Sequence, residues 1–128
     1  MNKSIKIVLA EDSTLFAALL KFRLEKEGYK LFIASDGKKA IELITEHQPD
    51  IILTDIMMPF LSGLEVTSYV RQTLKMTVPV IVFSAAGQEK MVMEAFNLGA
   101  TDFMGKPFNP NELIIRIKKA TISIPALN

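Results

Sequence analysis

The sequence predicts an α/β fold, a single domain built on a doubly wound, five-stranded parallel sheet with five helices. The chain has 128 residues, of which 49% are hydrophobic, enough for one sizeable core but too few for two comfortable domains. Five short apolar runs rich in β-branched or aromatic residues have the character of buried strands. Because stretches with helical spacing separate these runs, the strands are expected to lie parallel.

The five apolar runs are expected to form strands at residues 5–10, 31–34, 51–54, 78–83 and 101–104. Because strands and helices alternate five times over, helices are expected on both faces of the sheet. Apolar residues at helical spacing indicate the first three helices. These residues are Leu15, Leu19 and Phe22, then Ala40, Ile41, Leu43 and Ile44, and then Leu64, Val66, Val70 and Leu74.

The last two helices are indicated mainly by their ends. The fourth is expected at about residues 88–98 and is closed by Gly99. The fifth opens with the letters NPNE, in which Asn109 is a suitable N-cap and Pro110 suits the first helical position. Glu112 is placed to complete a capping box with Asn109. The tail SIPALN beyond this helix is expected to be frayed.

Charge and cysteine content exclude several classes of partner and site. Fifteen basic and fourteen acidic residues give a formal net charge of +1, so this domain is not expected to bind nucleic acid or a membrane directly. Without cysteine, neither disulfides nor thiolate metal sites can form. The start MNKSIKIVLAEDS lacks an apolar run long enough for a signal peptide or a spanning helix. A cytoplasmic location is therefore expected.

Polar side chains follow four of the five predicted strands. Glu11 and Asp12 follow the first strand, Asp55 the third, Ser84 the fourth and Lys106 the fifth. In an open parallel sheet, the loops at the carboxyl ends of the strands form the crevice in which ligands bind. Each of these residues has an ordinary structural role when it is considered alone. Together they predict a site that combines three acids, a hydroxyl and an ammonium.

Three neighbouring carboxylates require a compensating positive charge. Two like charges about 4 Å apart repel by roughly 4 kcal/mol at an effective dielectric constant near 20. Mg²⁺ suits such a site because it binds a few carboxylates, retains several waters and accepts phosphate oxygens. Lys106 offers a second positive charge for an oxyanion. The set therefore predicts phosphoryl transfer with Mg²⁺ as the cofactor and a carboxylate as the nucleophile.

Four stretches carry a family resemblance, and they occur in the order LAEDS, DIILTDIMMPFLSG, PVIVFSA and GATDFMGKPFNPNEL. They are similar to the receiver domains of two-component response regulators, including chemotaxis regulators, and the resemblance covers residues 5–120. It implies a flavodoxin-like fold with strand order 2-1-3-4-5, and a phosphorylation-dependent signalling switch rather than an enzyme. It also implies a receiver domain over residues 1–121, followed by a tail over 122–128 that could begin a linker to an effector domain.

The resemblance assigns roles to the acidic residues. Asp55 would accept a phosphoryl group from a phosphohistidine on a sensor histidine kinase or a phosphotransfer protein. Glu11, Asp12 and Asp55, together with the backbone carbonyl of Met57, would hold Mg²⁺. In this family the residues two positions after the phosphorylated aspartate and after the hydroxyl residue border the path of attacking water. Here these are Met57 and Ala86, which cannot orient water by a strong hydrogen bond, so slow autodephosphorylation is expected.

The resemblance also assigns roles to residues in and after the fourth and fifth strands. Ser84 and Lys106 would each bond a phosphoryl oxygen, and Phe103 would be the aromatic switch residue. The peptide bond between Lys106 and Pro107 would be cis. The family often has threonine and tyrosine at the positions of Ser84 and Phe103. Phe103 can therefore change its burial, but it has no phenolic hydroxyl with which to form an outward hydrogen bond.

The output surface is expected on the fourth helix, the fifth strand and the fifth helix, where an effector protein or a second copy would bind. A surface helix cannot bury every side, and the fourth helix carries surplus apolar residues at Met91, Val92, Ala95 and Leu98. Regulators of this family often dimerise through this face by cross-subunit ion pairs. Asp102 and Arg116 match one such pair, but Val92 stands where a basic residue is expected for another.

Two other classes of function remain open at this point. A Mg²⁺-dependent phosphatase could work through an aspartyl phosphate, although it usually needs a second acid close after the nucleophile, and Asp55 is followed by IMM. A flavodoxin-like cofactor binder needs a phosphate loop rich in hydroxyl groups and glycine after the first strand. The letters AEDSTLF offer acids there instead.

Overall fold

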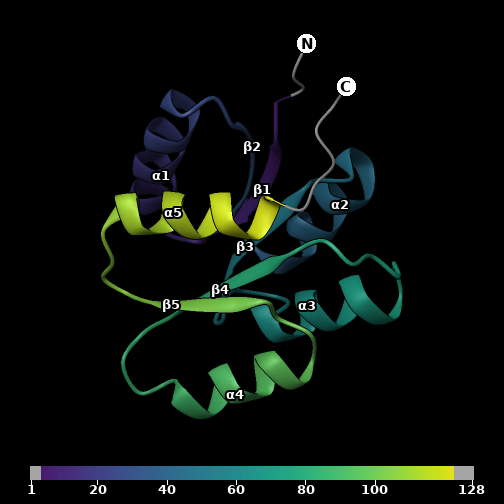
Figure 1. Ribbon diagram of the computed structural model, residues 1–128. Helices are drawn as coiled ribbons and strands as arrows, with labels where there is room; N and C mark the ends of the chain where they lie inside the picture. The colour runs from purple at the N-terminus through teal and green to yellow at the C-terminus, as the bar shows by residue number, and fades with distance from the viewer. Residues whose placement is uncertain (1–3, 123–128) are drawn as a thin grey trace.

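The computed structural model describes residues 4–122 and has five strands that alternate with five helices (Figure 1). The strands are β1 (Lys6–Ala10), β2 (Lys30–Ala34), β3 (Ile51–Asp55), β4 (Val80–Ser84) and β5 (Asp102–Gly105). The helices are α1 (Thr14–Lys26), α2 (Gly37–His47), α3 (Gly63–Gln72), α4 (Glu89–Asn97) and α5 (Pro110–Thr121). The predicted α/β class and alternation are therefore confirmed. The tail expected to be frayed, residues 123–128, lies outside the described residues.

All strands are parallel, and their order in the sheet is β2-β1-β3-β4-β5, as the resemblance implied. The register brings the ends of the strands to a common edge. Ala10 of β1 pairs with Thr54 of β3, so that Glu11 and Asp55 follow at the same level. Ser84 pairs with Gly105, and Lys106 comes next along the chain. The polar residues singled out from the sequence therefore meet at one edge of the sheet.

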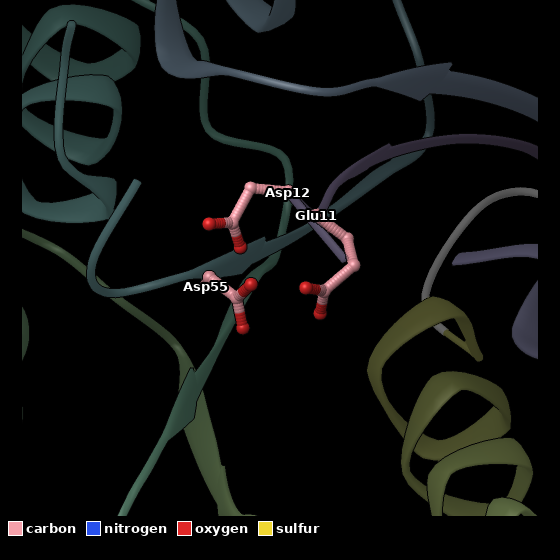
Figure 2. A group of neighbouring side chains, drawn as sticks. All are labelled: Glu11, Asp12 and Asp55. Carbon is pink, nitrogen blue, oxygen red and sulfur yellow. The ribbon is translucent and has the colours of Figure 1, made fainter. Parts of the chain in front are cut away.

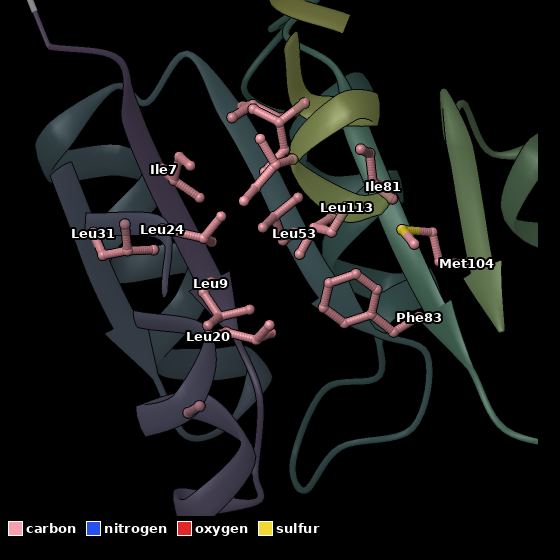
Figure 3. Close-up of a cluster of buried hydrophobic side chains, with 14 residues drawn as sticks. Ile7, Leu9, Leu20, Leu24, Leu31, Leu53, Ile81, Phe83, Met104 and Leu113 are labelled. Atoms are coloured by element: carbon pink, nitrogen blue, oxygen red, sulfur yellow. The ribbon is translucent and has the colours of Figure 1, made fainter. Parts of the chain in front are cut away.

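Helices cover both faces of the sheet and enclose two cores. On one face α1 and α5 pack over the strands, and Leu113 of α5 lies above the central strands (Figure 3). On the other face α2, α3 and α4 bury a second cluster. Every residue of β3 and β4 is buried, whereas Met104 is the buried residue of the edge strand β5. The site is thus supported by buried central strands on one side and an edge strand on the other.

Helix ends agree with the sequence at some positions and differ at others. Asn109 caps α5 by accepting a hydrogen bond from the Asn111 amide, and Pro110 is the first helical residue. The capping box expected at Glu112 is wrong, because this carboxylate pairs with Arg116 one turn later, at 2.9 Å. A complete capping box instead begins α3. Arg116 competes for Glu112, and the sequence letters alone do not reveal that competition.

The expected apolar surplus of α4 lies on a different side of the helix. Val92 is 8% exposed and Ala95 is fully buried, whereas Met93 is 65% exposed and Phe96 is also exposed. Helical positions three apart share a face. The orientation of α4 about its axis therefore places Val92 and Ala95 in the core and leaves Met93 and Phe96 at the surface. The prediction that Val92 and Ala95 contribute an exposed contact is therefore wrong. Within residues 4–122, no helix is long and apolar enough to cross a bilayer.

Candidate functional site

Three carboxylates converge at the carboxyl edge of the sheet. Glu11 and Asp12 leave the end of β1, Asp55 ends β3, and their side chains point into a common space (Figure 2). One oxygen from each residue lies within 4.8 Å of the others. Glu11 and Asp55 are buried, and Asp12 is exposed. The structure thus brings together the three acids that the sequence predicted.

Backbone contacts fix the two buried acids. The amide of Glu11 donates to the Ala34 carbonyl at 2.9 Å, while its carboxylate accepts from the Ser13 amide at 3.0 Å. After Asp55 the chain folds back so tightly that a β-carbon on Gly63 would lie 2.1 Å from the Asp55 carbonyl oxygen. Glycine is therefore required at the start of α3. The loop that leaves Asp55 is held close to the end of its own strand.

Lys106 places its ammonium between the two buried acids. Its Nζ lies 2.7 Å from Asp55 Oδ1 and 2.8 Å from Glu11 Oε1. The Lys106 amide donates to the Ser84 carbonyl at 2.7 Å, and the following peptide bond to Pro107 is cis, as expected. The ammonium also lies 4.7 Å from the ring centroid of Phe16. Phe16 was missed by the sequence argument because it looks like an ordinary apolar helix residue.

The cluster is short of positive charge. Burial and then the hydrogen bond to Glu11 raise the pKa of Asp55 to about 8, although Lys106 lowers it. Burial alone would raise the pKa of Glu11, but hydrogen bonds with Asp55, Lys106 and the Ser13 amide lower it below its ordinary value. Burial opposes the charge of Lys106, but both carboxylates raise its pKa overall. The single ammonium does not offset the effect of burial on both carboxylates, so the Asp55 carboxyl keeps its proton near pH 7.

These residues fit a hard divalent cation. The cluster offers carboxylate oxygens from three side chains within reach of one ion. Burial and the neighbouring Glu11 raise the pKa of Asp55, so a cation at this position would favour its ionised form. Mg²⁺ prefers oxygen ligands of this kind and keeps open positions for water or phosphate oxygens. Asp12, which is exposed, leaves the site accessible from solvent. The acidic cluster is thus chemically suited to the cofactor that the sequence predicted.

A small cavity adjoins Asp55. It has a volume of about 170 Å³ and is lined by Asp12, Asp55, Met57, Phe83, Ala85, Gln88 and Lys106. Met57, which the resemblance places on the path of attacking water, is thus one of the lining residues. Gln88 was missed, since it was considered only as a helix start. Its side-chain oxygen accepts from the Ala85 amide at 2.7 Å, which fixes the loop between β4 and α4 beside the cavity.

Ser84 and Phe103 lie together at a second, larger cavity. Its volume is about 430 Å³, and it extends from the Lys106 end of the site to α4. The lining residues are Ser84, Ala85, Ala86, Glu89, Val92, Met93, Phe96, Phe103, Gly105 and Lys106. Phe103 is 40% exposed and meets Phe96 edge to face, with ring centroids 6.1 Å apart. Ser84 therefore stands between the acidic site and an incompletely filled apolar space.

Arg116 is already engaged within the chain. It contacts Asp102 at 3.0 Å and Glu112 at 2.9 Å, and it donates to the Phe103 carbonyl at 2.8 Å. The Asp102–Arg116 pair, which the sequence matched to a contact between subunits, is thus formed inside one chain here. Arg116 ties α5 to the backbone of β5 at Phe103.

The fold and the site together define a class of protein, in which a parallel sheet carries an acidic cluster and a lysine at its carboxyl edge. The model of the response regulator receiver domain family matches residues 7–118, and the chain belongs to this family. Receiver domains are regulatory phosphoacceptors of two-component systems, not enzymes in the ordinary sense. They act as phosphorylation-dependent switches and interact with histidine kinases and effectors.

Solved structures agree closely with this assignment. The receiver domain of the Francisella response regulator 1452 is 32% identical, with a TM-score of 0.88 over 95% of this chain and 100% of that one. A CheY-like receiver domain protein from Methanospirillum hungatei JF-1 is 25% identical, with a TM-score of 0.89 over 94% and 95%. The signal receiver domain of a histidine kinase from Syntrophus aciditrophicus is 27% identical, with a TM-score of 0.87 over 98% and 96%.

Proposed function

We propose that this receiver domain accepts its phosphoryl group on Asp55 and uses it to alter the face formed by α4, β5 and α5. The position of Asp55 carries the proposal. Its carboxylate shares a space with Glu11 and Asp12, touches the Lys106 ammonium at 2.7 Å and lines the adjoining cavity. A nucleophile beside an oxyanion partner and a cation site is the arrangement that phosphoryl transfer needs.

In the proposed reaction an Asp55 carboxylate oxygen attacks phosphorus while the bond from phosphorus to a histidine nitrogen breaks. The imidazole leaves as the neutral base after taking up a proton, and an acyl phosphate remains on Asp55. Lys106 exchanges part of its contact with the carboxylates for a phosphoryl oxygen, and the Ser84 hydroxyl donates to another. Glu11, Asp12, Asp55 and the Met57 carbonyl would hold Mg²⁺, which supplies positive charge that favours ionised Asp55 and offsets the phosphoryl charge.

The donor in this proposal is a sensor histidine kinase or a phosphotransfer protein, which places the chain in the cytoplasm. The proposal treats residues 1–121 as one receiver domain and 122–128 as a tail. Decay of the acyl phosphate is expected to be slow, because Met57 and Ala86, the expected water-path residues, are exposed but have no strong hydrogen-bonding group.

The output surface in this proposal is apolar. Met93, Phe96 and Phe103 are exposed on α4 and β5, and Ile115 is exposed on α5. Movement of Ser84 toward a new phosphoryl oxygen enlarges the cavity into which the Phe103 ring can move. The apolar side chains exposed on this face then differ from those of the unphosphorylated chain. An effector protein or a second copy of the chain would read this change. The engagement of Arg116 within the chain favours an apolar contact over cross-subunit ion pairs.

The acceptor assignment is tested with phosphoramidate and Mg²⁺. Intact-mass analysis should show one added phosphoryl group on the wild type and none on Asp55→Asn, with peptide mapping locating the group at Asp55. Asp36→Asn is a suitable control, since Asp36 caps α2 and is not one of the clustered acids. Equal uptake by wild type and Asp55→Asn would refute the assignment.

A further inference from the structure

The loop between β3 and α3 contains a strained turn at Phe60. The Leu61 amide donates to the Pro59 carbonyl at 2.9 Å, which closes a three-residue turn around Phe60. The φ angle of Phe60 is +69°. A γ-turn with positive φ is rare and strained, and positive φ is a genuine outlier for a bulky side chain. Asparagine or glycine would occupy this position at a lower conformational cost.

The strain is not repaid by burial. Phe60 is 80% exposed, so its ring gains little from packing inside the chain. Large apolar side chains at the surface are common. Here, however, the backbone is strained and the ring also forgoes the free energy that burial would contribute. Strained residues of this kind persist where the surrounding structure over-determines them, and they cluster at functional sites.

The neighbouring structure holds the turn firmly. The Gly37 amide donates to the Pro59 carbonyl, and a β-carbon on Gly37 would lie 2.1 Å from the Leu61 carbonyl oxygen. The first residue of α2 is therefore fitted against the turn. Immediately after the turn, the Ser62–Glu65 capping box fixes the start of α3. Phe60 is thus presented by a loop that is secured on both sides.

The turn lies beside the acidic site. Met57, which lines the Asp55 cavity and is 55% exposed, is three residues before Phe60. Three residues of extended chain span at most about 11 Å, so the two Cα atoms are no farther apart than that. A standard protein interface covers roughly 800 Å² on each partner, the area of a disc about 16 Å in radius. An interface of that size centred on the Asp55 cavity would therefore reach the turn.

We propose that Phe60 is a docking residue for the protein that donates the phosphoryl group, and that its strained turn presents the ring to an apolar pocket beside the donor's phosphohistidine. The inference rests on the proposed function of Asp55. Aromatic anchors seated in pockets carry much of the binding energy of an interface, and a ring held in place before binding loses little freedom when it docks. The donor, rather than the effector, is the partner because the turn belongs to the loop that leaves the acceptor residue.

The test uses the full chain and the autophosphorylated cores of the histidine kinases encoded in the same genome, with the core that phosphorylates the wild type fastest as the probe. Phe60→Asn should lower kcat/KM for phosphoryl transfer by about 30-fold, through KM. Phe60→Tyr should retain most of the rate. Because asparagine tolerates positive φ, Phe60→Asn should also raise Tm by roughly 3 °C.

The matched control is Lys75→Asn. Lys75 is exposed, has a φ of +56° and lies in the connection between α3 and β4, which leads to the opposite end of the sheet. This variant should gain stability in the same way and leave transfer from the kinase unchanged. The control therefore separates relief of backbone strain from loss of a docking contact.

Uptake from phosphoramidate distinguishes this inference from the proposed function. Phe60→Asn should accept a phosphoryl group from phosphoramidate at the wild-type rate. Equal kinase transfer by Phe60→Asn and wild type overturns the docking role while leaving Asp55 as the acceptor. If no kinase core phosphorylates a wild-type chain that accepts phosphoramidate, the donor assignment also fails. Failure of wild-type uptake from phosphoramidate would instead overturn the proposed function itself.

Discussion

The acidic edge at β1 and β3 differs sharply from the face formed by β5 and α4. At the acidic edge, Glu11 and Asp55 are buried and both contact Lys106 within 2.8 Å. On the other face, Phe103 is partly exposed beside a cavity of about 430 Å³. The acid groups lie at the ends of β3, which is fully buried, and of β1, which is buried except at Lys6, whereas β5 is an edge strand with a partly open surface.

This difference separates chemistry from response. A group that must attack phosphorus benefits from a fixed position, because misplacement costs rate. A switching element must instead have two arrangements close in free energy, and such elements come from the less stable parts of a fold. Ser84 lies where the two regions meet, because it is the last residue of the buried strand β4 and also lines the larger cavity.

The first way to sharpen the comparison is removal of Asp12. This carboxylate is part of the acidic cluster but is exposed, so Asp12→Ala should preserve the fold while weakening Mg²⁺ binding by at least about 100-fold, more than the loss of an outer partner. Phe103→Leu, on the other face, should leave Mg²⁺ affinity unchanged. Calorimetric titration of both variants is the measurement, and similar losses in the two would contradict the separation.

The pH dependence of Mg²⁺ binding tests the charge balance at the acidic edge. The pKa of Asp55 is raised to about 8 by burial and by Glu11, so in the metal-free chain this carboxyl holds a proton at lower pH. Binding must release that proton, and affinity should fall about tenfold per pH unit below 8. A titration between pH 6.5 and pH 8.5 should show weaker binding at the acid end. The same affinity across this range would contradict a protonated Asp55.

A pair of substitutions on α4 tests which side of the helix is exposed. Val92→Asp places a carboxylate in the core and should destabilise the fold by about 3 kcal/mol, whereas Met93→Asp should change stability by about 0.5 kcal/mol or less. Denaturant unfolding measures both. If the output face is apolar, Met93→Asp should also weaken association of the phosphorylated chain in sedimentation. Undiminished association would remove Met93 from the interface.

The sequence predicted the acidic edge better than it predicted the opposite face. Asp55 ends a strand, and Glu11, Asp12 and Lys106 follow strand ends closely. Parallel register brings such positions together whatever the side-chain detail. No such rule fixes the orientation of α4 about its axis. This helix carries apolar residues on several sides, and helix propensity does not show which of them face the sheet.

Contacts that depend on close packing were also hidden from the sequence. The place of Phe16 beside Lys106 depends on how α1 docks on the sheet, and Gln88 acts through a local side-chain hydrogen bond. The positive φ of Phe60 follows from the fit of its loop against Gly37. A proline followed by phenylalanine gives no signal for such a turn.

The smallest effect is expected at Met57. Its exposed side chain borders the Asp55 cavity without a strong hydrogen-bonding group. Met57→Gln and Met57→Asn offer groups that can orient an attacking water molecule, so decay of the acyl phosphate should become several-fold faster. Loss of the added mass with time gives the rate. If neither variant decays faster than wild type, Met57 does not limit access of water.

Hydrogen exchange before and after phosphorylation tests the division between a fixed chemical edge and a responsive face most directly. With phosphoramidate and Mg²⁺, amide protection should change across α4, β5 and their connecting loops, while the amides of β1 and β3 keep their protection. Asp55→Asn under the same conditions should show no change in amide protection in either region. Equal changes in β1, β3, α4 and β5, or the same changes in Asp55→Asn, would contradict the account.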